Sequence, residues 1–211
     1  MDRAALKAKA KMDIRGKIWN LLGVSLIIYI VIFAISFILG FIPGVGSLLA
    51  VIVSAPLTLS LIKIYLAIAN EDKTPQIADA FCGYDDWKSA MKLYLLMLVY
   101  VFLWSLLLLI PGIIKSYAYS QAYFILAENK GMSAREALRR SEQMMNGRKM
   151  DFFILSLSFI GWSLLGALTF GIAYIWILPY MQATYANFYN SIKPANDAPV
   201  IDAAPSDTTE K

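Results

Sequence analysis

The sequence contains no histidine, a single cysteine (Cys82) and few charged residues, which make up 16% of its 211 residues. The missing histidine removes the commonest general base and the commonest metal ligand. One cysteine cannot form a disulfide within the chain, which excludes an extracellular fold held together by disulfides. An ordinary soluble domain carries roughly 25% charged residues. The low charge, together with 59% hydrophobic residues, therefore indicates an integral membrane protein.

The first long apolar run predicts two membrane helices. Residues 18–62 form 45 consecutive positions without a charge. A helix of that length is too long for one crossing of a hydrocarbon core of about 30 Å. The proline- and glycine-rich stretch 43–46 divides the run, which predicts helices near 18–42 and 47–69, the second bent at Pro56.

Further apolar regions predict four more membrane helices. Residues 152–192 form 41 positions without a charge, and a turn is expected around 169–171. Another pair is expected on either side of the turn formed by Pro111 and Gly112. The four helices predicted from these regions cover residues 92–110, 113–128, 152–169 and 172–190.

These runs predict an all-α fold: a polytopic membrane bundle of about six transmembrane helices, paired as three hairpins and accompanied by amphipathic cytoplasmic helices. Residues 1–192 are expected to form one membrane helical domain. Residues 193–211 are rich in proline, alanine and aspartate, and we expect a disordered cytoplasmic tail there.

The basic residues predict the orientation in the membrane. Of the 19 lysines and arginines, 17 lie in the segments 1–17, 70–92, 128–151 and 193–211, and the predicted turns contain none. Cytoplasmic segments of membrane proteins carry the excess of lysine and arginine. We therefore expect a multi-pass cell-membrane protein with both termini in the cytoplasm. A single broken helix over 92–128 would put the basic segments on opposite sides, and we reject it.

The chain shows a weak internal repetition. The sequence Ile-Pro-Gly-Val at 42–45 resembles Ile-Pro-Gly-Ile at 110–113, and each predicted hairpin follows a polar, partly amphipathic segment. Three repeated hairpins would produce this pattern. Basic flanks and Pro-Gly turns also recur in helical membrane proteins without repeats, so both interpretations stay open.

Two polar segments predict short amphipathic helices. In the first, Thr74 and Pro75 predict a helix start, with Ile77 and Phe81 on one face. In the second, a capping box at 133–136 predicts a helix that ends at Gly147. The apolar side of this second helix consists of Ala134, Ala137, Leu138, Ser141, Met144 and Met145.

The helix that starts at 134 has two possible positions: it lies in the headgroup layer, or it packs against the cytoplasmic ends of the bundle. Its arginines and the basic residues that follow are the candidates for contact with anionic lipid. Lys115 joins them because its position, one turn past the Pro-Gly turn, predicts that it reaches the outer headgroups. The candidate lipid-interface or regulatory residues are Arg135, Arg139, Arg140, Arg148, Lys149 and Lys115.

Ionisable residues are scarce inside the predicted spans. Lys63 lies about two turns from the cytoplasmic end of its helix and is expected to extend toward the headgroups. A buried functional lysine is the alternative at Lys63 and at Lys115. Proton- or sodium-coupled transporters usually need a carboxylate in mid-span, and no aspartate or glutamate occupies such a position. Coupled transport is therefore disfavoured.

Several motifs together resemble a bacterial integral membrane family catalogued as domain of unknown function nine-seven-five. They lie at 110–120, 125–129, 136–141 and 144–149, with further matches at 159–162 and 179–180. The resemblance covers about residues 1–190 and implies a location in the bacterial plasma membrane. It implies no activity, because the family has none assigned.

A looser similarity connects the chain to the membrane domain that precedes some glycerophosphodiester phosphodiesterases. It rests on the Pro-Gly turn at 111–112, on Glu128 at the end of the next span, and on Ala-Leu-Arg-Arg-Ser at 137–141. The catalytic barrel of those enzymes has no counterpart in this chain, so the similarity implies no enzymatic residue.

We therefore expect a non-enzymatic bacterial plasma-membrane protein that scaffolds, regulates or binds lipid through its cytoplasmic helices. No catalytic, cofactor-binding or metal-ligating residue is predicted. The expected partners are anionic lipid headgroups, with a second copy or another membrane protein as further candidates, and no nucleic acid. The alternative is a small oligomeric transporter or export accessory protein. An intramembrane enzyme using Ser60 and Lys63, which have helical spacing, ranks third.

Overall fold

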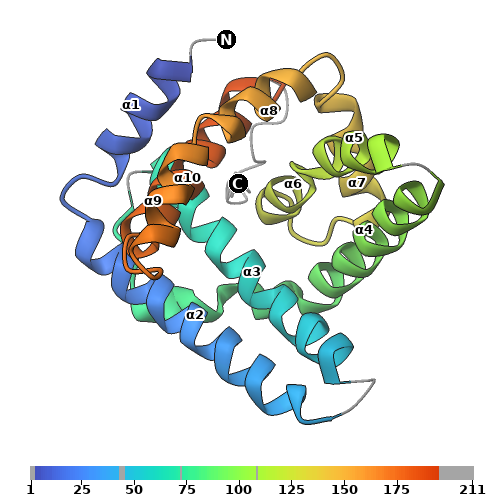
Figure 1. Cartoon of the computed structure of the whole chain (residues 1–211), viewed down its shortest axis with the longest axis horizontal. Coiled ribbons are helices and arrows are strands. Elements are labelled where there is room, and N and C mark those ends of the chain that lie inside the picture. Colours follow the sequence, from blue (N-terminus) through green and yellow to red (C-terminus); the bar gives the residue numbers. More distant parts are fainter. Residues whose placement is uncertain (1–2, 43–45, 72, 108, 195–211) are drawn as a thin grey trace, which may run out of the picture.

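The computed structural model describes residues 3–42, 46–71, 73–107 and 109–194. Every regular element in these ranges is a helix, which confirms the all-helical class (Figure 1). Most of the predicted tail, from residue 195 onward, lies outside the described residues. The elements are α1 (Arg3–Asp13), α2 (Ile18–Gly40), α3 (Gly46–Glu71), the 3₁₀ helix η1 (Ile77–Asp86), α4 (Trp87–Leu107), α5 (Leu109–Tyr119), α6 (Ala122–Glu128), α7 (Ala134–Met144), α8 (Lys149–Leu157), α9 (Ile160–Leu168) and α10 (Tyr174–Ile192).

Within the described residues, four helical stretches are long and apolar enough to cross a membrane: Ile18–Gly40, Val53–Asn70, Ile77–Leu106 and Lys149–Leu168. The protein itself buries 61% of Val53–Asn70 but only 11% of the most apolar part of Ile77–Leu106. Apolar helices whose side chains point away from their own core need an apolar surrounding. These helices indicate a membrane protein.

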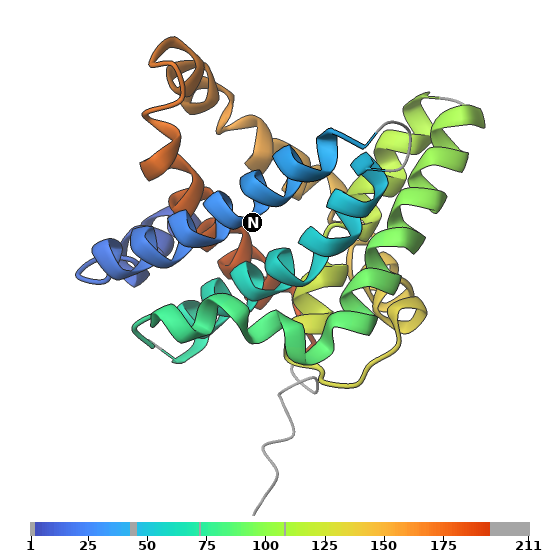
Figure 2. The ribbon, with the colours of Figure 1, turned by 90° about the horizontal axis from the view of Figure 1, so that it is seen from below.

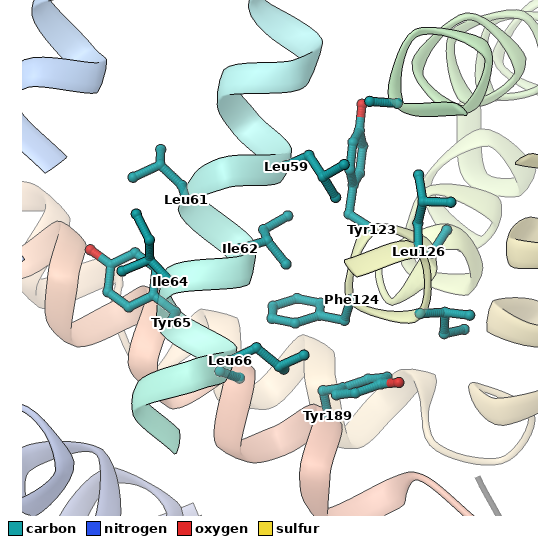
Figure 3. Close-up of a cluster of buried hydrophobic side chains, with 14 of the residues drawn as sticks. Leu59, Leu61, Ile62, Ile64, Tyr65, Leu66, Tyr123, Phe124, Leu126 and Tyr189 are labelled. Atoms are coloured by element: carbon teal, nitrogen blue, oxygen red, sulfur yellow. The ribbon is translucent and has the colours of Figure 1, made fainter. Parts of the chain in front are cut away.

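The described helices form pairs around a common core. α2 packs along α3, α4 along α5, and α9 against α10. α3, α6 and α10 lie innermost: α3 contacts both of the others, and the ring of Phe124 on α6 stacks on that of Tyr189 on α10. Figure 3 shows this core, in which Leu59 and Ile62 of α3 point toward the aromatic side chains of α6.

A polar helix packs on each of the three innermost helices. η1 packs on α3, and α7 packs on α5 and α6, so each covers the pair that precedes it in the chain. α1 packs on α10, the inner helix of the last pair. The arrangement is therefore cyclic. Each polar helix precedes one pair in the chain and packs on the innermost helix that comes before that pair, and α1 closes the cycle by packing on α10.

Two predicted helix boundaries are wrong. Residues 111–112 form no turn, because α5 already begins at Leu109 and contains Pro111 in its first turn. Proline is tolerated there, since the first helical N–H groups have no partner within the helix. The short helix expected to start after Thr74 begins at Ile77 instead. The N–H of Gln76 donates to the carboxylate of Asp79 (2.8 Å), which closes a capping box and starts the helix two residues later than predicted.

The turn between α9 and α10 lies where it was predicted. α9 ends at Leu168, and both Phe170 (φ +50°) and Gly171 (φ +93°) are left-handed. The N–H of Gly171 donates to the carbonyl of Gly166 (2.9 Å), which ends the helix. The glycine at 171 makes this reversal possible without a side-chain clash.

Candidate functional site

Lys63 holds η1 against α3. Its Nζ donates to Oδ2 of Asp86 (3.0 Å) and to the carbonyl oxygen of Cys82 (3.2 Å). The side chains of Lys63 and Asp86 are only 14% and 16% exposed. Lys63 was expected to extend toward the headgroups, and the structure gives it partners on η1. A largely buried pair of this kind sets which residues face each other more than it adds stability.

The backbones of η1 and α3 are in direct contact beside this pair. The N–H of Gly83 donates to Oγ of Ser60 (2.8 Å), and that hydroxyl donates to the carbonyl of Pro56 (3.2 Å). A Cβ atom on Gly83 would lie 2.1 Å from the Pro56 oxygen. Ser60 is fully buried in this contact. Ser60 and Lys63, which have helical spacing, thus both hold η1 on α3.

α7 is held on α5 and α6 by the same kind of contacts. Lys115 forms an ion pair with Glu142 and lies over the ring of Trp104 (5.1 Å). Oγ of Ser141 donates to the carbonyl of Ala118 (2.7 Å) and accepts from the N–H of Gln121 (3.2 Å). Ser141 therefore satisfies two backbone groups at the break between α5 and α6.

The structure shows a protein partner for Lys115, because its Nζ points to Glu142 of α7. Its contact with the outer headgroups stays a prediction. Two ion pairs make corresponding contacts. Lys63 of α3 pairs with Asp86 of η1, and Lys115 of α5 pairs with Glu142 of α7. Each pair joins a helix to the polar helix that follows it in the chain.

The apolar face of α7 is covered by protein. The helix starts as predicted, because Oγ of Ser133 accepts from the N–H of Glu136 (3.2 Å). Ala137, Leu138 and Met145 are at most 3% exposed. Of the two positions considered for this helix, packing against the bundle is therefore the one adopted. A face buried in this way is not available for insertion into lipid.

The outward face of α7 is charged. Glu136 accepts from Nε and Nη2 of Arg139 (3.0 and 2.9 Å) and from Nε of Arg140 (3.0 Å). These arginines lower the pKa of Glu136 to about 2. Arg135 is exposed on the same helix.

The remaining predicted basic residues follow α7. Arg148 is exposed and precedes α8, and Lys149 is its half-buried first residue. Lys115 contacts α7 through Glu142, and Arg139 and Arg140 share Glu136 on the same helix. Arg148 and Lys149 lie beyond the C-terminal end of α7. The net positive charge of this surface is smaller than the sequence alone suggests, because Glu136 and Glu142 each engage basic residues of the set.

Glu128 joins the ends of the three inner helices. Its Oε1 accepts from Nζ of Lys193 (2.7 Å) and Nδ2 of Asn70 (3.3 Å), and its Oε2 accepts from the hydroxyl of Tyr189 (2.7 Å). The Glu128 side chain is only 6% exposed. The sequence marks Glu128 merely as the end of a span, since its partners lie 58 to 65 positions away.

A basic cavity of about 370 Å³ lies between α3, η1 and the segment before α7. Lys63, Lys73 and Lys130 line it, together with Asp79 and Cys82. Lys73 pairs with Asp79 (3.4 Å) in an exposed position. Two of the three ammonium groups are already paired, Lys63 with Asp86 and Lys73 with Asp79, which reduces the positive charge that the cavity offers to an anion. No group of three or more cysteine, aspartate or glutamate side chains suited to a metal ion occurs in the described part of the chain.

Comparison with protein families matches the chain to one family model in two overlapping segments, residues 1–115 and 105–196. The comparisons with curated proteins and with solved structures return no match. The matched segments cover most of the chain and include every pair of helices described above. The chain therefore belongs to the family described as "Protein of unknown function (DUF975)".

Proposed function

We propose that this protein is a non-enzymatic bacterial cell-membrane protein that binds anionic lipid headgroups and acts as a scaffold or regulator through its cytoplasmic helices. The observation that carries the proposal is the position of α7. Its apolar face is buried in the bundle, and its outward face presents Arg135 and Arg139. A helix held in this way offers the membrane or an acidic partner a fixed surface with a small excess of positive charge.

The proposal includes six spans with both termini in the cytoplasm. The spans are α2, α3, α4, α5 with α6, α8 with α9, and α10. Figure 2 supports this orientation: the C-terminal ends of α2 and α4 and the α9–α10 turn lie toward the top, whereas η1, α7 and the end of α10 lie lower.

α10 is less apolar than the outer helices, yet a span is consistent with its position. Its 19 residues would measure about 28 Å. Its polar side chains Thr184 and Asn187 are buried in the protein. An inner helix that contacts protein can carry such residues, because they do not meet lipid.

The orientation predicts which cysteines an impermeant thiol reagent labels in intact cells. In a Cys82→Ala background, Ile42→Cys, Ile110→Cys and Ile172→Cys should react from outside, because these exposed residues lie near the proposed outer turns. Thr74→Cys and Asn146→Cys, both exposed on the proposed inner side, should react only after the cells are permeabilised. Labelling of residue 146 in intact cells would contradict the six-span orientation.

The function predicts what co-purifies with the protein. After extraction in a mild detergent, mass spectrometry of the bound lipid should show anionic phospholipid enriched over the bulk membrane. Each exposed basic residue contributes about 1 kcal/mol, or roughly fivefold, near an anionic surface. Replacing Arg135, Arg139 and Arg148 with glutamine should reduce the enrichment.

The same experiment separates the alternatives. A defined protein present in equal amount would support the scaffold role, whereas a small solute present in equal amount would favour a transporter. Lipid in the proportions of the bulk membrane, with no protein partner, would refute the proposal. The similarity to the membrane domain of glycerophosphodiester phosphodiesterases stays a prediction from the sequence motifs.

A further inference from the structure

A groove with a volume of about 920 Å³ lies between α1 and the α9–α10 pair. We propose that it binds one anionic phospholipid, with an acyl chain along Trp162, Trp176 and Tyr180 and the phosphate at Lys11 and Arg15. This inference rests on the proposed function and names one site for it. In Figure 2 the α9–α10 pair rises away from the start of α2.

The walls of the groove are fixed in place before any ligand binds. Nζ of Lys7 on α1 donates to the carbonyl of Ser158, between α8 and α9 (3.3 Å), and lies 4.2 Å from the centre of the Phe159 ring. On the other wall, Nδ2 of Asn187 donates to Oδ2 of Asp13 (2.6 Å). α1 is thus tied to both neighbouring elements, and little ordering is needed when a ligand enters.

The apolar part of the groove suits a hydrocarbon chain. Its floor includes the buried side chains of Ile14 and Ile177. Trp162 and Trp176 line it and are each about half exposed, at 49% and 50%. Tryptophan and tyrosine are typical of the boundary between headgroups and acyl chains, because the ring is apolar and its N–H or O–H group is polar.

The charged part of the groove selects the sign of the headgroup. Lys11 and Arg15 line the groove, and both are exposed. Among the described residues, those that line the groove include no aspartate or glutamate. The nearby carboxylate of Asp13 is engaged by Asn187. Two cations beside an apolar channel complement an anionic phospholipid better than a zwitterionic one, whose headgroup carries its own cation.

Binding of defined lipids to the full chain tests the site. Delipidated protein in detergent is titrated with dioleoylphosphatidylglycerol or dioleoylphosphatidylcholine, and the bound lipid is counted by native mass spectrometry. We expect one tight site for the anionic lipid. The double variant Lys11→Gln/Arg15→Gln should weaken that site on the order of tenfold or more, with an unchanged melting temperature. The matched control Lys88→Gln/Lys92→Gln removes the same charge from α4 and should leave the site unchanged.

A second variant tests the apolar part without changing the charge. Ala8 lines the groove and is exposed, so Ala8→Trp should partly fill the groove and weaken binding of the anionic lipid. Equal losses in the two charge variants, or full binding by Ala8→Trp, would overturn the groove site while leaving the proposed function standing. Equal binding of both lipids by the unmodified protein would overturn the proposed function as well.

Discussion

Replacing Gly83 with alanine is expected to destabilise the protein by about 2–3 kcal/mol, because a methyl group has no room at this position. The added Cβ would lie 2.1 Å from the Pro56 oxygen and 2.7 Å from the Ser60 nitrogen, and both are backbone atoms of α3. η1 would have to move away from α3. That movement would also break the hydrogen bond from the Gly83 N–H to Ser60 and separate Lys63 from Asp86.

The measurement is thermal unfolding in detergent, with Gly23→Ala as the control. Gly23 is also helical, but a Cβ atom there meets nothing within 4 Å. Alanine should therefore leave stability unchanged or raise it by up to about 1 kcal/mol. A local readout is the rate at which a thiol reagent modifies Cys82, which is half-buried beside the contact. Equal melting temperatures and equal rates in the two variants would show that η1 is not seated on α3 as described.

Removing the carboxylate of Glu128 is expected to destabilise the protein by about 2–3 kcal/mol. Glu128→Ala leaves Lys193 without its partner and removes the acceptor from Tyr189 and Asn70. Breaking a buried ion pair by removing one partner costs about 3–5 kcal/mol. Because Lys193 is 21% exposed and can regain water, we expect a smaller value. The contact between α10 and the other inner helices should loosen first.

Glu142→Ala is the matched control. Its carboxylate also pairs with a lysine, Lys115, but it is 43% exposed, so its loss should cost less than about 1 kcal/mol. Glu128→Gln keeps the shape of the side chain and should fall between the two alanine variants. Melting temperatures in detergent and the rate of proteolysis at the end of α10 measure the effects. Equal behaviour of Glu128→Ala and Glu142→Ala would contradict the role given to the inner-helix cluster.

The sequence by itself determined the features that depend on neighbouring residues. Long runs without charge predict helices, because the backbone must satisfy its own hydrogen bonds in lipid. The start of α7 was predicted at the right residue, since a capping box needs only Ser133 and the N–H groups of its own first turn. The turn at Gly171 also depends on local sequence, because one glycine allows the left-handed conformation that ends α9.

Short-range signals failed where the same residues fit two structures. Proline at 111 marks a turn in the sequence, yet it is equally compatible with the first turn of a helix, and α5 uses it there. The start of η1 was placed too early because Pro75 is a plausible first helical residue, whereas Asp79 caps the helix from Gln76.

Only the tertiary structure decided what the polar residues do. The amphipathic pattern of α7 is the same whether lipid or protein covers its apolar face, and the burial of Leu138 settles that protein does. Lys63 and Lys115 find carboxylates 23 and 27 positions away, and Glu128 finds partners still farther along the chain. No local pattern encodes such pairs. They form because helix packing brings charges from separate segments together. At Lys63 and Glu128 the site is also largely buried, so an unpaired charge there would be costly.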